Sequence, residues 1–302
     1  MTLLLIEQML NGLQLGVMLF LMAAGLTLVF GVMGLINLAH GALFMVGAFA
    51  AATVASFTGS YMLGVVASVV AAAIAGVLVE MLVIRRLYAR DHLDQVLATF
   101  ALILIFSEGT RMIFGSFPLY LNIPEAVSGP VTLPLGIQYP LFRLVLIAVG
   151  LAVALGLYLM ITRTRIGIQI QAGEADREMI SALGINISSL YTIVFALGAA
   201  LAGLAGALIG TLQSVEVGMG EPVLITAFVV IVIGGIGSVQ GALVGAILVG
   251  VAQTLGAFLF PIWSTALFGS QEIGSILSSM LIYILMAVVL LFRPKGLMGG
   301  AT

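Results

Sequence analysis

The stretch YMLGVVASVVAAAIAGVLVEMLVIRRLYAR, residues 61–90, decides the fold of this chain. It stays apolar to about residue 84, apart from Glu80, and then turns basic at Arg85, Arg86 and Arg90. An apolar run of about 20 residues is long enough to cross a bilayer as an α-helix. Lys and Arg beside such a run are enriched on the cytoplasmic side. The stretch therefore predicts a membrane helix that ends in the cytoplasm.

The composition of the whole chain agrees with a membrane protein. Of its 302 residues, 62% are hydrophobic and only 7% are charged, whereas soluble domains carry roughly 25% charged residues. Membrane β-strands would alternate apolar and polar residues over about 10 positions, but the apolar runs here are continuous. We therefore predict an all-α, polytopic inner-membrane helical bundle, forming one domain over residues 1–302.

About eight or nine hydrophobic segments follow one another along the chain. They lie near residues 8–32, 39–57, 61–84, 95–114, 141–162, 190–212, 223–236, 239–260 and 275–292. The first 84 residues hold no Lys or Arg, so the basic-residue rule leaves the orientation of the N-terminus open. The N-terminus is either outside, or inside with one early segment re-entrant.

Three basic clusters predict the topology of the rest. They lie at residues 85–90, at 163–177, and at Arg293 with Lys295, and all three places are expected in the cytoplasm, including the C-terminus. The segment 115–140 then lies outside as a periplasmic loop. It holds five of the eight prolines, and proline lacks the amide donor that a helix interior needs. This segment should be an ordered extended loop rather than a span.

The composition and motifs exclude several function classes. A formal net charge of −2 and the lack of a basic patch argue against nucleic-acid binding. The chain has no cysteine, which excludes disulfides and thiolate metal sites, and we predict no metal site. No G-x-x-x-x-G-K-[ST] phosphate loop occurs. Any ATP hydrolysis linked to this protein must therefore come from another chain.

Two glycine-rich breaks interrupt the hydrophobic runs. The stretches GLINLAHGAL (34–43) and GGIGSVQGAL (234–243) align with an offset of 200 residues and share five identities. Transporters often place broken helices at matching positions of two internal halves, where they line the substrate path. Chance similarity in a chain rich in Gly, Ala and Leu is the equal alternative. The candidate path residues are Asn37, His40, Gly41, Gly234, Gly235, Gly237, Ser238 and Gln240.

Polar side chains at membrane depth tend to face a cavity or a partner helix. His40 could contact substrate, but a histidine held by a neighbouring backbone carbonyl is the commoner case. A proton relay would need acids and histidines along the spans, and the chain offers only Glu80 and the pair Glu108 and Arg111. The spacing of that pair is typical of a structural ion pair on one helix face.

The loop at about 163–189 gathers charge that the rest of the chain lacks. Within it, QAGEADREMISALGIN (171–186) predicts a short amphipathic helix over about 172–183, with early acids, an apolar face, and Gly184 as its stop. Such a helix could simply anchor the loop at the interface. Its acids do not suit an anionic lipid surface, however, so a protein partner whose groove takes the helix is the better interpretation.

The same stretch resembles the EAA signature of permeases in bacterial ABC importers. More narrowly, the chain resembles the LivH-type permeases of branched-chain amino-acid uptake. Besides 164–186, the matching pieces are GLINLAHGALFMVGAF (34–49), ALAGLAGAL (200–208), GGIGSVQGALVGA (234–246) and LFRPKGLMG (291–299). In that family the loop forms a coupling helix that sits in a cleft of the ATPase subunit. The resemblance thus implies these coupling residues: Gly173, Glu174, Ala175, Asp176, Arg177, Glu178, Leu183 and Gly184.

The resemblance further implies the partners. Such permeases pair with a second, related membrane subunit in a heterodimer. Two cytoplasmic ATPase subunits, which bind ATP and Mg, drive them, and a periplasmic binding protein delivers the substrate. The chain itself is expected to be no enzyme and to bind no cofactor.

The expected function is import of leucine, isoleucine, valine or related amino acids across the bacterial inner membrane. Related systems carry urea, short amides or other amino acids, so the substrate stays open. An ATPase-independent secondary carrier is the alternative from another class, although the spans lack the paired acids and bases that would favour it.

Overall fold

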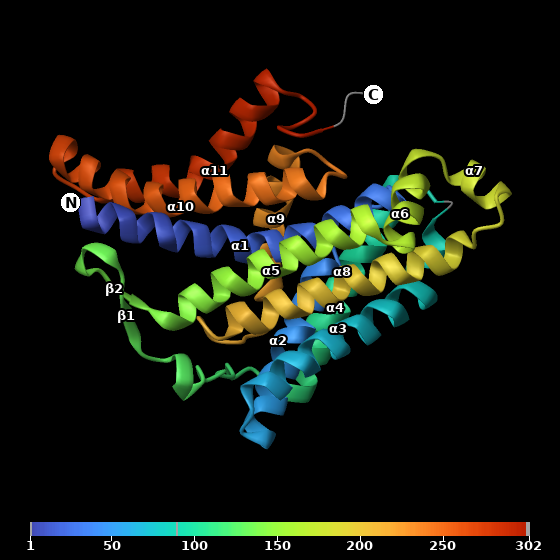
Figure 1. Cartoon of the computed structure of the whole chain (residues 1–302), viewed down its shortest axis with the longest axis horizontal. Coiled ribbons are helices and arrows are strands. Elements are labelled where there is room, and N and C mark those ends of the chain that lie inside the picture. Colours follow the sequence, from blue (N-terminus) through green and yellow to red (C-terminus); the bar gives the residue numbers. More distant parts are fainter. Residues whose placement is uncertain (1, 89, 300–302) are drawn as a thin grey trace. The chain divides into compact units, whose positions relative to one another are not determined.

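The computed structural model describes residues 2–88 and 90–299, without the side chains of Leu135, Arg177 and Glu178 (Figure 1). The elements in chain order are α1 (Thr2–Met33), α2 (His40–Thr58), α3 (Tyr61–Leu82), η1 (Ile84–Leu87), α4 (His92–Phe114), η2 (Glu125–Val127), β1 (Pro130–Thr132), η3 (Pro134–Gly136), β2 (Gln138–Pro140), α5 (Leu141–Arg163), α6 (Arg165–Ala175), α7 (Arg177–Ala182), α8 (Ile187–Gly210), α9 (Gly220–Gly234), α10 (Val239–Phe268) and α11 (Glu272–Phe292).

The structure confirms the predicted class of a helical membrane bundle. Within the described residues, eight helices are long and apolar enough to cross a membrane, and α9 is a shorter apolar helix. Helices suit this setting because each one satisfies its own backbone hydrogen bonds where no water is available.

The proline-rich segment 115–140 does not span, as predicted. It contains two 3-10 turns and a short antiparallel hairpin in which Val131 of β1 pairs with Tyr139 of β2.

The chain forms two compact units, and each is described by itself. The α2–α3–α8 unit comprises residues 21–123 and 153–226, and the α10–α11 unit comprises residues 1–20, 124–152 and 227–302. Helices α1, α5 and α9 contribute residues to both units. The single membrane domain predicted for residues 1–302 remains a prediction.

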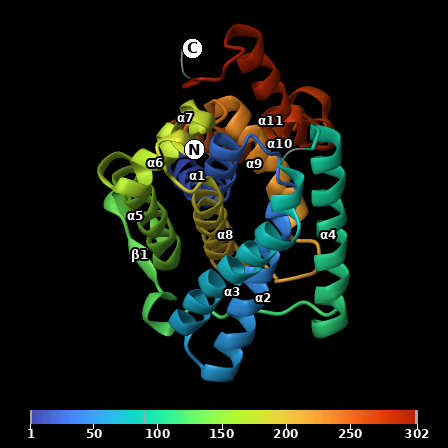
Figure 2. The same ribbon diagram turned by 90° about the vertical axis from the view of Figure 1, so that its right-hand side faces the viewer.

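Close main-chain contacts at glycines hold the α2–α3–α8 unit together, and its three central helices lie side by side (Figure 2). A Cβ on Gly47 of α2 would clash with the main chain of Gly203 on α8. On its other side, Gly203 approaches α3, since a Cβ there would lie 2.6 Å from the carbonyl oxygen of Ser68. Small residues drive association in lipid because they let backbones approach and gain van der Waals contact.

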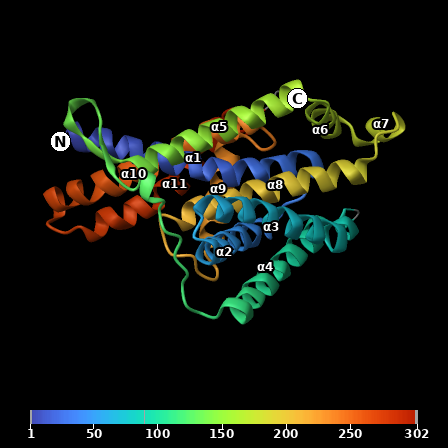
Figure 3. The ribbon, with the colours of Figure 1, turned by 60° about the horizontal axis from the view of Figure 1, so that its bottom comes forward.

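Close contacts at glycines also hold the α10–α11 unit together. Helices α10 and α11 form an antiparallel hairpin (Figure 3), and a Cβ on Gly256 would meet the Leu281 side chain at 2.5 Å. Near the start of α1, a Cβ on Gly12 would lie 2.7 Å from the Cα of Val251 on α10. Gly12 and Gly256 therefore mark where α10 touches its two neighbours within this unit.

The substitution Gly47→Ala tests the glycine contact between α2 and α8. The added methyl group has backbone in its way, so the helices must separate, and overpacking of this kind destabilises by roughly 1–3 kcal/mol. Gly156→Ala in α5 is the matched control, since a Cβ there meets nothing within 4 Å. Alanine has the better helix propensity, so the control should be neutral or stabilised by up to about 1 kcal/mol. Thermal unfolding of the purified protein in detergent measures both, and equal midpoints for the two variants would contradict the packing argument.

Candidate functional site

The charged loop between α5 and α8 folds into the two short helices α6 and α7. Thr164 caps α6, because its hydroxyl accepts a hydrogen bond from the Gly167 amide at 3.1 Å. The buried face of α6 includes Gly173, where a Cβ would contact the side chains of Leu190 on α8 and Val32 on α1. Helix α6 therefore packs against α8 and the end of α1 within the α2–α3–α8 unit, and α7 follows it in the chain.

The single helix predicted over residues 172–183 is wrong in its bounds. The chain leaves helical geometry at Asp176, which is extended with φ −155° and ψ 104°. The Asp176 carboxylate accepts a hydrogen bond from the Met179 amide at 2.9 Å and so caps α7. Aspartate competes for backbone amides in this way and therefore favours the cap over a helix interior. As a result, Glu174 and Ala175 end α6 instead of beginning α7.

Helix α7 exposes apolar side chains on a short, well-terminated helix. Ile180 is buried, whereas Met179 is 58% exposed and Leu183 is 73% exposed. The helix ends where the Gly184 amide bonds the Ser181 carbonyl and the Ile185 amide bonds the Ile180 carbonyl. This pattern places Gly184 in the left-handed region, at φ 85°, where glycine is the favoured residue. The predicted coupling residues Arg177 and Glu178 have side chains outside the described part of the structure.

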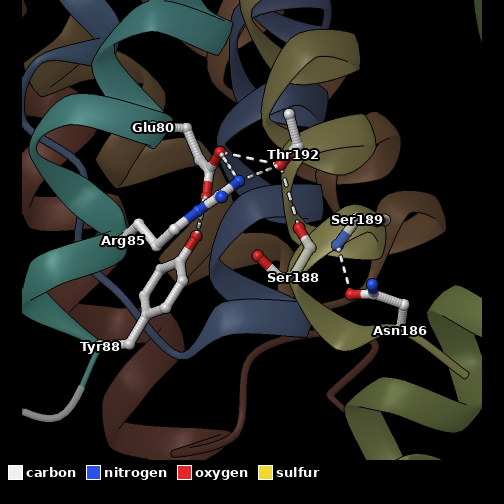
Figure 4. Close-up of polar contacts among 7 residues, drawn as sticks. All are labelled: Glu80, Arg85, Tyr88, Asn186, Ser188, Ser189 and Thr192. Atoms are coloured by element: carbon white, nitrogen blue, oxygen red, sulfur yellow. Dashed lines mark hydrogen bonds and ion pairs between the residues drawn. The ribbon is translucent and has the colours of Figure 1, made fainter.

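A buried polar cluster lies where α3 and η1 meet α8, close to the end of the charged loop (Figure 4). Glu80 is fully buried and forms a two-pronged ion pair with Arg85, with Nε to Oε1 at 3.1 Å and Nη2 to Oε2 at 3.0 Å. The Tyr88 hydroxyl donates to Glu80 Oε1 at 2.6 Å, and the Thr192 hydroxyl donates to Oε2 at 2.8 Å. Arg85 Nη2 also donates to the Thr192 hydroxyl at 2.8 Å. We call Glu80, Arg85, Tyr88 and Thr192 the Glu80 cluster.

The tyrosine of this cluster is held in its donor form. Burial, together with the neighbouring Glu80 carboxylate, raises the pKa of the Tyr88 hydroxyl, so the phenol keeps the proton that it donates. Its ring also meets Tyr191 of α8 edge-on, with 5.0 Å between ring centroids.

Sequence reasoning noted Glu80 near a cytoplasmic end but missed its partners. The available signal was an acid five residues before Arg85 at the end of an apolar run, since a buried charge must find a counter-charge. Thr192 carried no such signal, because it lies 112 positions away in the sequence. By contrast, the expected pair of Glu108 and Arg111 is confirmed, with 2.9 Å between Oε1 and Nη1.

The first helix break, between α1 and α2, leaves polar groups without partners. Gly34 turns the chain with φ 64°, and α2 begins at His40 without a side-chain cap. Asn37 and His40 are fully buried, and within the described residues none of their side-chain nitrogen or oxygen atoms has a hydrogen-bond partner. The main chain of Met22 lies near the His40 imidazole. The backbone contact expected for His40 is therefore present near Met22, but it lies outside ordinary hydrogen-bond geometry.

The second helix break, between α9 and α10, is capped on both sides. The Ser238 hydroxyl accepts from the Gly241 amide at 3.0 Å at the start of α10. At the end of α9, the Leu297 amide donates to the Ile233 carbonyl at 2.8 Å, and the Met298 amide donates to the Gly234 carbonyl at 2.9 Å. The C-terminal segment thus satisfies carbonyls that the helix end leaves free.

The remaining candidate residues divide between the two units. Gly235 and Gly237 have positive φ values at the second break, and Gln240 is exposed on α10. Asn37, His40 and Gly41 belong to the α2–α3–α8 unit, and the five candidates at 234–240 belong to the α10–α11 unit. Each set is gathered at one break of its own unit. Gly41 also packs against main chain, since a Cβ there would lie 2.8 Å from the carbonyl oxygen of Gly220.

The chain is similar in sequence to known proteins. Residues 8–290 match the family model described as the permease component of the branched-chain amino acid transport system. The high-affinity branched-chain amino acid transport permease BraD of Pseudomonas aeruginosa is 30% identical, over 97% of this chain and 95% of that protein. The corresponding permease LivH of Escherichia coli is 28% identical, with the same shares covered. A probable LivH of Methanocaldococcus jannaschii is 26% identical, over 93% and 89%. No solved structure matches the chain.

The cap of α7 can be tested by Asp176→Ala. Loss of an aspartate N-cap costs about 0.5–2 kcal/mol of local helix stability, so residues 177–183 should exchange their amide hydrogens about two- to thirtyfold faster. Asp176→Asn keeps a capping oxygen and should stay near the wild-type rate. Hydrogen exchange followed by mass spectrometry measures this, and equal rates in the two variants would mean that Asp176 does not hold the helix.

Proposed function

Because the chain belongs to the family of branched-chain amino acid transport permeases, we propose that it is a membrane subunit of an ATP-driven importer for leucine, isoleucine and valine. The chain is a non-catalytic transport subunit and a multi-pass membrane protein of a bacterial transport system. ATP hydrolysis therefore takes place on partner subunits, which would bind ATP and Mg.

One observation carries the proposal, namely the construction of α7. Helix α7 has only six residues, is capped at Asp176 and is stopped at Gly184. The side chains of Met179 and Leu183 are nevertheless exposed on its surface. Exposed apolar side chains on such a small, stiff helix are suited to insertion into a groove of another protein. The residue set 173–178 with 183 and 184 is accordingly our proposed coupling site for the ATPase.

The proposed assembly rests on the family of the chain, because LivH-type permeases act within ABC transporter complexes. We expect a second, related permease subunit, two cytoplasmic ATPase subunits, and a periplasmic binding protein that hands over the substrate. The loop at 163–189 and the C-terminus then lie in the cytoplasm of a bacterial inner membrane, because basic residues flank these places.

The substrate class rests on the relatives, whose names specify branched-chain amino acids. At 26–30% identity, urea, short amides or other amino acids remain the alternatives within the same importer family. Few fixed charges occur in the spans, which fits a path where the binding protein does the selecting.

We place the translocation path at the two helix breaks. At the first, Asn37 and His40 keep unpaired polar groups in the interior, next to Gly41. A buried polar group without a partner destabilises the fold by about 1–3 kcal/mol, and a passing substrate could provide such a partner. At the second, Gly234, Gly235, Gly237, Ser238 and Gln240 form the matching candidates.

Reconstitution tests the proposed function. The chain would be co-purified with the ATPases, second permease and binding protein of its importer, and assayed in proteoliposomes. We expect leucine uptake that needs both ATP and the binding protein and that excess urea or acetamide does not inhibit. Uptake of leucine without the binding protein would contradict the delivery step. A tagged chain that never recovers ATPase subunits would favour the secondary carrier.

In the same assay, Leu183→Asp should lower the recovery of ATPase about tenfold or more, because a charge replaces an apolar anchor of the interface. Ser181→Asp adds the same charge to the same exposed helix without removing an apolar contact, and it should bind nearly as wild type. Equal recovery with both variants would remove α7 from the interface.

Asn37→Leu separates a transport role from a folding role. Replacing an unpaired buried amide by an apolar group of similar size should leave the unfolding temperature unchanged or raise it. If Asn37 faces the path, leucine uptake should nevertheless fall about tenfold, the size of effect expected when a polar contact is lost. Uptake that stays at the wild-type level, with unfolding equally unaffected, would remove Asn37 from the path.

A further inference from the structure

We propose that Thr192 and Glu80 are positioning residues for ATP-coupled transport, linking α8 to α3 so that a displacement of α7 moves both helices together. This inference rests on the proposed function of α7 as the site of ATPase contact. Thr192 and Glu80 are the residues through which a motion of α7 would reach the membrane helices of the α2–α3–α8 unit.

The route begins with a stiff connection from α7 to α8. The turn after α7 is short and is closed at Gly184, and Asn186 then caps α8 by accepting from the Ser189 amide at 3.1 Å. Only a few residues separate the two helices, and hydrogen bonds occupy both ends of the turn. A displacement of α7 therefore acts directly on the first turn of α8, where Figure 4 shows the cap between Asn186 and Ser189.

Thr192 then passes the displacement to α3. Its hydroxyl reaches the Ser188 carbonyl within α8 at 3.0 Å and Glu80 Oε2 on α3 at 2.8 Å, and it accepts from Arg85 at 2.8 Å. Of the polar contacts drawn in Figure 4, the two that Thr192 makes with Glu80 and Arg85 cross from α8 to α3 and η1. The remaining bonds of the Glu80 cluster join residues of the same chain segment, 80–88.

Charge and burial make this link rigid. Glu80 has no exposed side-chain surface, and its carboxylate takes four hydrogen bonds from three side chains. Hydrogen bonds to an ionised group are shorter and about twice as strong as neutral ones. Each oxygen of Glu80 thus has its position set from more than one side.

Holding the fold together does not account for this cluster. Further along, α3 and α8 already touch at glycines, where a Cβ on Gly76 would overlap the side chain of Ala199, and one on Gly203 would lie 2.5 Å from Ala72 Cβ. A buried ion pair is also a poor source of stability, since apolar residues of similar volume often do as well. Its geometric definition, and its place beside the charged loop, point instead to control of position.

The substitution Thr192→Val tests the link, because it keeps the side-chain shape and removes the hydroxyl. Tyr88→Phe is the matched control. It also removes one hydrogen bond to Glu80, but it leaves the Thr192 bonds in place and keeps the ring that meets Tyr191. Both variants would be purified in the full complex with its ATPases and binding protein. ATP hydrolysis and leucine uptake would then be measured on the same proteoliposomes.

We expect Thr192→Val to raise the ATP consumed per leucine imported about threefold or more, the scale on which positions along a coupling route act. Assembly and the unfolding temperature should stay close to wild type, and Tyr88→Phe should keep a near-wild-type ratio. A Thr192→Val complex with the wild-type ratio, or one whose ratio changes no more than that of Tyr88→Phe, would overturn the inference.

The substitution Glu80→Gln, alone and combined with Thr192→Val in a double variant, tests whether Thr192 acts through Glu80. If Thr192 acts through the Glu80 carboxylate, the ratio in the double variant should match that of Glu80→Gln alone. Multiplied effects in the double variant would overturn the route through Glu80. A wild-type complex that does not couple ATP hydrolysis to leucine uptake would instead contradict the proposed function, so the two failures are distinguishable.

Discussion

Helices α2 and α8 touch main chain to main chain at Gly47 and Gly203, and the rest of the α2–α3–α8 unit depends on this contact. Lipid tails are as apolar as the side chains, so the bilayer offers no hydrophobic force to bring helices together. Close approach at small residues has to supply the attraction through van der Waals contact. Glycines at such contacts therefore stabilise the packing of the helices.

The two helix breaks show how differently one local pattern can be completed. Both begin where glycine takes a positive φ, at Gly34 and at Gly235. At the second break, Ser238 and the C-terminal segment satisfy the free backbone groups. At the first, α2 begins uncapped, and Asn37 and His40 lie buried without partners within the described residues. Buried polar groups of this kind call for an explanation, and the proposed translocation path supplies one.

At the end of the charged loop, by contrast, the polar groups are hydrogen-bonded to one another. There, short helices with defined caps lead into α8, and the Glu80 cluster fastens α8 to α3. The unit thus combines a loosely satisfied polar site at the α1–α2 break with a tightly satisfied one beside α7. In the proposed coupling, the rigid region beside α7 would transmit motion, and the region at the α1–α2 break would change state.

The sequence by itself determined the class of the fold, because uninterrupted apolar runs such as residues 61–84 are compatible only with membrane helices. It also located the extended proline-rich loop, the breaks at Gly34 and Gly234, and the stop at Gly184, since proline and glycine act through their own backbone geometry. Local rules were insufficient at Asp176, where capping won over helix continuation and divided the predicted helix. Tertiary structure alone decided which polar groups meet: Thr192 reaches Glu80 across 112 positions, and the C-terminal segment caps α9. Such pairings depend on how the helices pack. Glycine contacts set this packing, but the sequence does not show which helix each glycine contacts.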